Sequence, residues 1–419
     1  MSLKKGDSTF ELTKEKLEFL LIPDLGMNIK VEGFKTRPLT QHGDNYGSTI
    51  LAVEVSIIQD INKHNLSLVA KLVPSSQFLR EVFVTDISFN KEVNAYKLVS
   101  KEFEILQIEN GIPLHKQFNG FPKFYGARTN REGNINEKAD ETAVLLLENL
   151  KESGYATGNR LVGLDLIHMK LGVRKLAQFH ALSIAIKILK PNNIITGGVA
   201  DCIVAEKWIT SAINDVKVIP DCVQYLEKIE KILRDDMKER QNPSLISYME
   251  PFATFVHNDF WVNNIMFKYE PQTWSKNGTS VIQIPTHVKI VDFQITLYAS
   301  PIKDLIFFIY SSSADGIVDD CYDELINIYY TELVNYLKDL RCDAGSFSFD
   351  SFQKDLNINA PKEFPHILYM HKYISADQNK LPDLSSCGVD EIIQNNYGGE
   401  LYEKRVKFLI KDFLQRGWL

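Results

Sequence analysis

The spacing of apolar residues changes near residue 150, and this change limits the folds that the chain can adopt. Before that point, stretches of period-two alternation or β-branched enrichment are separated by polar, turn-like segments, which is typical of strands. A helical stretch is also expected at about 89–107. The expected strands cover residues 30–38, 48–58, 65–73, 123–129 and 142–147. The front part is therefore predicted to be an antiparallel sheet with one main helix.

After residue 150, apolar residues recur at helical spacing. Helices are expected within 164–189, 201–240, 301–340 and 400–415. A chain of 419 residues is longer than one hydrophobic core usually supports. We therefore predict an α+β fold with a β-rich N-lobe at 1–148 and a mainly helical C-lobe at 149–419.

Composition excludes several classes of protein. The net charge is −7, and no basic stripe is present that would neutralise nucleic-acid phosphates. The five cysteines form no CxxC pair, which argues against a disulfide framework or a zinc site. Apolar runs such as 305–310 are too short to cross a bilayer, and residues 1–14 lack the apolar core of a secretory signal. We expect a cytoplasmic protein with no nucleic-acid partner, no membrane insertion and no obligate protein partner.

Two segments carry acidic and amide side chains at the edge of an apolar, strand-like run. The first contains His257, Asp259 and Asn264 in the pattern H-x-D-x-x-x-x-N, and the second ends in Asp292. This spacing allows an Asp to orient a hydroxyl while an Asn five residues later turns back to a metal ion. An Asp after a β-branched strand is suited to bind Mg²⁺ that bridges nucleotide phosphates. The two segments therefore predict phosphoryl transfer, with His257 bracing the loop through hydrogen bonds.

Lys71 lies inside an apolar strand, where a lysine is costly unless it meets an anion. Its expected anions are the α and β phosphates of a nucleotide and the carboxylate of Glu92, in the following helix. Glu81 and Glu102 are alternative partners, and a lysine on an edge strand would instead extend to solvent.

Two further segments lie where a nucleotide-binding lobe needs them. The turn Gly43-Asp44-Asn45-Tyr46-Gly47-Ser48 separates the first two strands, where its backbone N–H groups and the Ser48 hydroxyl would face phosphates. Glu148-Asn149-Leu150 follows the last strand, where its backbone would hydrogen-bond adenine.

These residues resemble the ecdysteroid-kinase-like family of insects and other invertebrates, within the aminoglycoside phosphotransferase and choline kinase superfamily. The matching stretches are 43–48, 71–74, 89–96, 146–150, 176–183, 257–267 and 292–294. The last hundred residues match only in helical character.

The resemblance implies a two-lobed, protein-kinase-like fold and a kinase that uses ATP and Mg²⁺. It implies Asp259 as catalytic base, Asn264 and Asp292 as Mg²⁺ ligands, and Lys71 as the phosphate-binding lysine paired with Glu92. ATP–Mg²⁺ is expected in the cleft between the lobes, with the acceptor against the C-lobe. The implied acceptor is the hydroxyl of a steroid such as an ecdysteroid, or of another lipophilic alcohol. Aromatic residues that would line an apolar acceptor pocket are Trp261, Tyr298, Phe307, Phe308, Tyr310, Tyr369 and Tyr373.

Two other functions are considered beside this one. The family usually has Gly where this chain has Asn258, and the resulting H-N-D triplet is more like that of choline kinases. A choline or ethanolamine kinase would need an aromatic cage, usually with carboxylates, for the ammonium group. A pseudokinase that only binds other molecules would have no need to retain Lys71, Asp259, Asn264 and Asp292 together.

Overall fold

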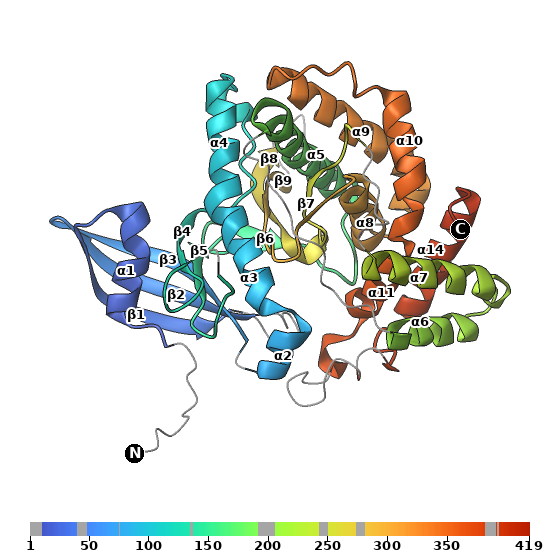
Figure 1. The fold of residues 1–419 in the computed structure, drawn as a ribbon, viewed down its shortest axis with the longest axis horizontal. Coiled ribbons are helices and arrows are strands. Elements are labelled where there is room, and N and C mark those ends of the chain that lie inside the picture. Colours follow the sequence, from blue (N-terminus) through green and yellow to red (C-terminus); the bar gives the residue numbers. More distant parts are fainter. Residues whose placement is uncertain are drawn as a thin grey trace. The chain divides into compact units, whose positions relative to one another are not determined.

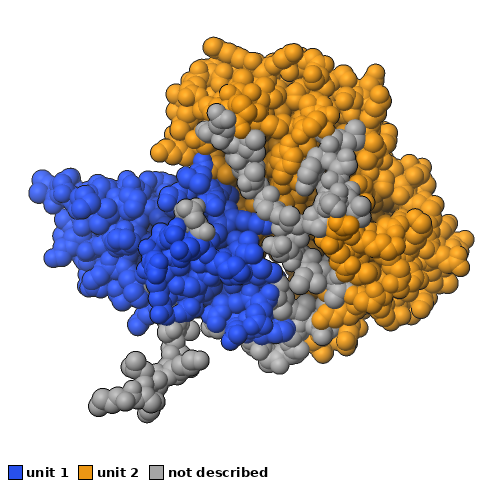
Figure 2. Space-filling model, in the orientation of Figure 1, with its two compact units in different colours: residues 1–98, 122–153, 382–388 blue, residues 99–121, 154–381, 389–419 orange. Residues whose placement is uncertain are grey.

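The computed structural model divides the chain into two compact units, coloured separately in Figure 2. Unit 1 takes its described residues from 1–98 and 122–153, and unit 2 takes the remaining ones. The structure describes residues 11–39, 48–74, 76–134, 137–191, 206–242, 250–273, 281–381, 391 and 394–419. Each unit is considered by itself below.

The described part of unit 1 contains a five-stranded antiparallel sheet in the order β1-β2-β3-β5-β4 (Figure 1). Its strands are β1 (Ile29–Pro38), β2 (Thr49–Gln59), β3 (Asn62–Leu72), β4 (Phe124–Arg128) and β5 (Val144–Glu148). In β3, Lys71 pairs with Ile50 on one side and with Leu145 on the other. Lys71 therefore lies on an internal strand, which excludes the edge-strand alternative.

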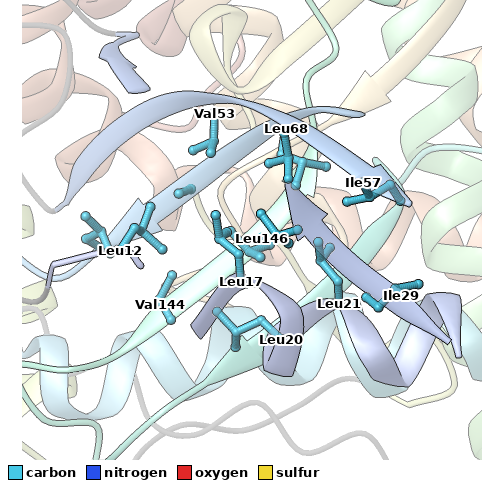
Figure 3. Close-up of a cluster of buried hydrophobic side chains, with 14 residues drawn as sticks. Leu12, Leu17, Leu20, Leu21, Ile29, Val53, Ile57, Leu68, Val144 and Leu146 are labelled. Carbon is cyan, nitrogen blue, oxygen red and sulfur yellow. The ribbon is translucent and has the colours of Figure 1, made fainter. Parts of the chain in front are cut away.

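Helix α1 (Lys14–Leu25) covers one face of this sheet. Leu17, Leu20 and Leu21 recur at helical spacing and pack into a buried cluster with side chains from the strands, among them Val53 and Leu68 (Figure 3). The approach is so close at Gly126 that an added Cβ would lie 2.0 Å from the backbone oxygen of Leu20. This helix was not expected from the sequence.

The helical stretch expected at 89–107 is longer and is interrupted. It comprises α3 (Thr85–Asn94), a π-helical turn η1 (Ala95–Val99) and α4 (Ser100–Glu109), and the short helix α2 (Gln77–Val82) precedes it. Helix α3 belongs to unit 1, whereas α4 belongs to unit 2.

Helices dominate unit 2, and the central one is α5 (Leu166–Leu189). The side chain of Asp165 caps its first turn by accepting hydrogen bonds from the N–H groups of Ile167 and His168. Thirteen of its residues are buried, and it packs against α4, α8 and α9. The other long helices are α6 (Glu206–Val218), α7 (Leu226–Gln241), α8 (Ile302–Ser312), α9 (Ile317–Asp339), α10 (Phe349–Asn359), α11 (Phe364–Ser375) and α14 (Gly399–Gln415).

Two small antiparallel sheets in unit 2 hold the motif-bearing segments. One has the order β6-β8-β9 and the other pairs β10 with β7. Their strands are β6 (Tyr155–Thr157), β7 (Thr254–Val256), β8 (Ile265–Thr273), β9 (Val281–Ile290) and β10 (Leu297–Ala299). The residues from 257 to 264 thus connect two anchored strands, β7 and β8.

The predicted α+β class is confirmed, with the antiparallel sheet in the N-terminal part and helices in the C-terminal part. The domain boundary at 148/149 stays a prediction, and the units differ from it in assigning 99–121 to unit 2. Within the described ranges, no helix has the length and apolarity needed to span a membrane.

Candidate active site

In unit 1, Lys71 and Glu92 form a buried ion pair. The Lys71 ammonium lies 2.6 Å from a carboxylate oxygen of Glu92, and the two side chains are 6% and 2% exposed. The two alternative acids have other partners, since Glu81 accepts a hydrogen bond from Gln77 and Glu102 pairs with Lys190. The predicted pairing of Lys71 with Glu92 is thus present, and its role in binding phosphates stays a prediction.

The predicted phosphate turn lies mostly outside the described residues. Gly43, Asp44, Asn45, Tyr46 and Gly47 fall in this undescribed stretch. Ser48 is described and is buried next to the start of β2.

The predicted adenine segment begins at the end of β5. The Glu148 carboxylate accepts hydrogen bonds from the Lys123 N–H and the Ser153 hydroxyl. The Asn149 side chain donates to the Ser67 hydroxyl at 3.1 Å, and Leu150 is buried. Side-chain contacts within unit 1 therefore hold this segment in place.

In unit 2, the buried carboxylate of Asp304 holds the start of the loop between β7 and β8. It accepts hydrogen bonds from the N–H groups of His257 (2.6 Å) and Asn258 (2.7 Å), and from Nε2 of His180 (3.1 Å). His180 completes this core group by accepting from the Tyr329 hydroxyl at 2.7 Å. His180 is thus a buried core histidine whose ring nitrogens are both hydrogen-bonded.

Asp304 binds backbone groups outside its own helix. It lies inside the first turn of α8, and its carboxylate binds the N–H groups of the 257–258 segment. A signal was present, because an acidic residue within the apolar run 302–310 must find donors if it is buried. Its partners lie 46 and 47 residues away in sequence, so the pattern did not identify them.

His257 is fully buried and hydrogen-bonded on both sides of its ring. Nε2 donates to the Val291 carbonyl oxygen at 2.9 Å, and Nδ1 accepts from the Asp259 N–H at 3.2 Å. Burial lowers the pKa of His257, which favours the neutral ring. Its contacts fit a brace between the two motif-bearing segments.

Asp259 and Asn264 are joined directly. The Asn264 amide donates to the Asp259 carbonyl oxygen at 2.9 Å and to its carboxylate oxygen at 2.8 Å. The Val291 N–H in turn donates to the Asn264 carbonyl oxygen at 2.9 Å. Because Ile265 pairs with Ile290 across β8 and β9, Asp292 follows immediately after this contact. The fold thus brings the predicted site residues of unit 2 together.

Two carboxyl groups, those of Asp259 and Asp292, lie close enough to influence one another. Burial and the neighbouring Asp292 carboxylate raise the pKa of Asp259 well above its usual value. Of the described residues, no group of three or more His, Cys, Asp or Glu side chains is arranged to hold a metal ion. One carboxylate from Asp292 and one amide oxygen from Asn264 fit a Mg²⁺ ion that takes its other ligands from water and phosphates. The donor set of Asp292 and Asn264 therefore fits Mg²⁺.

The sequence model of the ecdysteroid kinase-like family matches residues 42–342, a range that includes every residue of this candidate site. The chain belongs to the ecdysteroid kinase-like family. Membership makes it a kinase-like phosphotransferase that uses an alcohol group as acceptor. No curated protein matches the chain.

Several solved structures are similar to this ecdysteroid kinase-like protein at low identity. Spectinomycin phosphotransferase APH(9)-Ia with ADP and spectinomycin has a TM-score of 0.40 at 10% identity, covering 97% of this chain and 99% of that one. APH(2")-IIIa with GDP and kanamycin has a TM-score of 0.37 at 11% identity, covering 94% and 97%. Macrolide 2'-phosphotransferase MphH from Brachybacterium faecium has a TM-score of 0.31 at 10% identity, covering 85% and 92%.

The residue at which this ecdysteroid kinase-like chain departs from the family pattern has a backbone explanation. Asn258 has a φ of 65°, in the left-handed region that glycine adopts most easily. Asparagine is among the few other residues that tolerate this region. Its side chain also donates to the Ile295 carbonyl oxygen at 3.1 Å. The backbone conformation therefore accounts for an asparagine at this position.

The aromatic residues proposed for an acceptor pocket have different environments. Phe307 and Phe308 are fully buried core residues of α8. Tyr310 hydrogen-bonds the Asp412 carboxylate, and Tyr298 hydrogen-bonds Glu250. Tyr369 and Tyr373 line a small cavity among the described residues of unit 2. Trp208, which the sequence did not suggest, lines it as well.

Proposed function

We propose that this protein transfers the γ-phosphoryl group of ATP to the hydroxyl of a steroid or another neutral lipophilic alcohol. The observation that carries the proposal is the group formed by Asp259, Asn264 and Asp292. The first two are hydrogen-bonded, and the third follows the strand that contacts Asn264. Such an arrangement suits an acceptor hydroxyl beside a metal-bound nucleotide.

Asp259 would orient the acceptor hydroxyl and take its proton as the oxygen attacks the phosphorus atom. The Asn264 amide holds one carboxylate oxygen at 2.8 Å and so limits rotation of the Asp259 side chain. A raised pKa makes Asp259 a stronger base once it is ionised. The rigid loop, fixed by Asp304 and His257, keeps this carboxylate in place during transfer.

The remaining residues would bind the nucleotide. Lys71, oriented by Glu92, would contact the α and β phosphates, and Ser48 with the 43–47 turn would cover them. The backbone of Glu148, Asn149 and Leu150 would hydrogen-bond adenine. Asn264 and Asp292 would hold Mg²⁺, which when bound neutralises charge on the β and γ phosphates.

Two observations support a neutral acceptor and a working enzyme. The family is named for ecdysteroid kinases, and the H-N-D triplet, which alone favoured choline, is accounted for by the φ of Asn258. The charged and amide groups needed for catalysis are retained and pre-positioned within each unit. A protein that only binds partners would have no reason to keep them.

The test is ATP consumption measured with an ecdysteroid, choline, ethanolamine and an aminoglycoside as separate acceptors. We expect turnover with the ecdysteroid, and a fall of about 10²–10⁴-fold in the Asp259→Asn variant. Asp355→Asn is the matched control, because Asp355 is a buried carboxylate with a raised pKa that lies on α10 and binds Ser300 and Asn359. Turnover of choline alone would contradict the steroid assignment. ATP binding without turnover of any acceptor would favour a binding protein.

A further inference from the structure

Trp261 lies two residues after Asp259 in the loop between β7 and β8, two strands labelled in Figure 1. Burial alternates along this loop, since Phe260 and Val262 are fully buried whereas Asp259 and Trp261 are partly exposed. The Phe260 ring packs against Phe308 of α8, with centroids 4.9 Å apart. Successive side chains of extended backbone point to opposite sides, and Trp261 is extended (φ −142°, ψ 177°). Asp259 and Trp261 therefore share the side that faces away from this core contact.

Hydrogen bonds fix the backbone on both sides of Trp261. The Asn264 N–H donates to the Trp261 carbonyl oxygen at 2.9 Å, and the Val262 N–H donates to the Ser312 hydroxyl at 3.0 Å. The Asn264 amide donates back to the carbonyl oxygen and the carboxylate of Asp259. The segment from Asp259 to Asn264 thus closes on itself and holds Trp261 beside the proposed base.

The indole N–H of Trp261 is a buried donor that makes no hydrogen bond of normal geometry to any residue that the structure describes. It nevertheless interacts with Asp259. Burial and the Asp292 carboxylate raise the pKa of Asp259, whereas hydrogen bonding from the Asn264 and Trp261 side chains lowers it. The N–H thus lies near this carboxylate but off the line of an ideal hydrogen bond. Catalytic hydrogen bonds are often long or poorly aligned until substrate is bound.

The Asp259 carboxylate has room for this donor. Asn264 binds one of its oxygens at 2.8 Å, and no other hydrogen bond of normal geometry reaches the carboxylate from the described part of the chain. An ionised carboxylate accepts about four hydrogen bonds, so an indole N–H and a substrate hydroxyl can bind it together. The terminal torsion of an aspartate has a broad energy minimum, and one donor leaves the plane of the group free to tilt. A second donor would fix that plane.

We propose that Trp261 is a positioning residue, whose indole N–H donates to the Asp259 carboxylate and, with the Asn264 amide, fixes its plane while the acceptor hydroxyl is bound. This role rests on the proposed function and adds a residue to it. As the hydroxyl oxygen forms its bond to the γ-phosphorus, the bond from phosphorus to the leaving ADP oxygen breaks and the hydroxyl proton passes to Asp259. Trp261 exchanges no proton in this step.

A different role for Trp261, as a wall of an apolar acceptor pocket, would need its ring but not its N–H group. Trp261→Phe separates the two roles because it keeps an aromatic ring and removes the donor. Loss of a wall contact should raise the KM of the acceptor. Loss of the positioning donor should instead lower kcat.

The first measurement does not depend on catalysis. Urea unfolding of wild type, Trp261→Phe, Asp259→Ala and the double variant gives the coupling between the two side chains. We expect the unfolding equilibrium constants to depart from additivity by about three- to tenfold. The matched control is the same cycle with Trp208→Phe, because the Trp208 ring packs against Tyr369 and Tyr373 of α11 and should show no coupling to residue 259. No coupling at Trp261, or equal coupling at Trp208, would overturn the proposal.

The second measurement is phosphoryl transfer from ATP to androstanediol, a steroid with two hydroxyl groups. Trp261→Phe should lower kcat about tenfold and change the KM of the steroid by less than about twofold. In the Asp259→Ala protein, the same substitution should leave the residual rate unchanged, because the group that Trp261 positions is absent. An equal fall in both backgrounds, or a rise in KM with normal kcat, would overturn the positioning role.

The two measurements separate the role of Trp261 from the proposed function. Coupling between Trp261 and Asp259 without transfer to any acceptor would contradict the proposed function and leave the contact intact. Transfer by a protein in which the two side chains show no coupling would leave the proposed function intact and overturn the role of Trp261.

Discussion

The two charged groups proposed for nucleotide chemistry differ in the charges that they bring together. In unit 1, the buried ammonium of Lys71 faces the buried carboxylate of Glu92 at 2.6 Å. In unit 2, Asp259 lies near the Asp292 carboxylate, and this proximity together with burial raises the pKa of Asp259. The first group pairs unlike charges, whereas the second brings two carboxyl groups close together.

The difference predicts how a change of charge in each group affects the stability of the protein. A buried ion pair holds its geometry without a ligand, but it is strongly destabilised if one partner is removed. A pair of close carboxylates instead costs stability, which a bound cation would recover. Removing a charge should therefore have opposite effects on stability in the two units.

The largest effect is expected for Lys71→Met. This change removes the Lys71 ammonium from the buried Glu92 carboxylate, so unfolding free energy should fall by about 3–5 kcal/mol. The double variant Lys71→Met/Glu92→Gln should recover most of this loss without recovering ATP binding. Denaturant unfolding measures the unfolding free energy, and ATP titration measures ATP binding.

The matched control is Lys63→Met, on the same strand. Lys63 forms an exposed pair with Glu32, so this variant should lose no more than about 1 kcal/mol of unfolding free energy. Equal losses of unfolding free energy in Lys71→Met and Lys63→Met would contradict the contrast between the buried and the exposed ion pair.

Asp304→Asn should have the next largest effect. An amide at this position presents an N–H group to backbone N–H donors at residues 257 and 258, which now bind carboxylate oxygens at 2.6 and 2.7 Å. We expect a loss of about 3 kcal/mol in the free energy of unfolding. The fall in kcat per folded molecule should exceed that of Asp355→Asn. A stable Asp304→Asn protein with normal kcat would show that the loop does not depend on this carboxylate.

A smaller effect is expected at Asn258, whose φ is 65°. Asn258→Val should lower stability by about 1–2 kcal/mol because a β-branched residue is strained in the left-handed region. Asn258→Gly, the matched variant, should change stability by only a few tenths of a kcal/mol and keep activity. Thermal unfolding of both proteins measures this difference. Similar melting temperatures for the two would argue against the backbone explanation.

The smallest expected effect is a gain in stability rather than a loss. Without nucleotide, Asp259→Asn should raise Tm at pH 7 by about 1–3 °C, because it removes a carboxylate that is costly to ionise. The folded protein holds the Asp259 proton more tightly than the unfolded chain, so its pKa is higher in the folded state. Protonation of Asp259 therefore stabilises the folded protein below the ordinary aspartate pKa of 3.8. This stabilisation is lost as pH rises toward the raised pKa of Asp259 in the folded protein. The gain in Tm should shrink as pH falls toward about 4, and a gain independent of pH would contradict this cause.

The sequence predicted the parts of the structure that depend on local pattern and missed those that depend on distant contacts. Alternating apolar residues located the strands, and the buried position of Lys71 followed from its apolar neighbours. Helix α1 was missed because its stability comes from the packing of Leu17, Leu20 and Leu21 on the sheet. The bracing role of Asp304 required contact with residues 46 and 47 positions away.

The small cavity lined by α6 and α11 could not be identified from sequence for the same reason. Tyr369 and Tyr373 were candidates among many aromatic residues, and nothing in the pattern separated them from the core residues Phe307 and Phe308. Trp208 joins them only because α6 packs beside α11. Two helices far apart in sequence create this cavity, so composition alone does not reveal it.

The central claim is that Asp292 completes a magnesium-dependent phosphotransferase centre with Asp259 and Asn264. The most direct test is the transfer of radiolabelled phosphoryl from ATP to androstanediol by wild-type protein and by Asp292→Asn, with Mg²⁺ and with excess chelator. We predict labelled steroid phosphate with wild type and Mg²⁺, none with chelator, and a fall of at least about 10²-fold in the variant. Wild-type transfer rates in Asp292→Asn, or transfer that continues without divalent cation, would contradict the account.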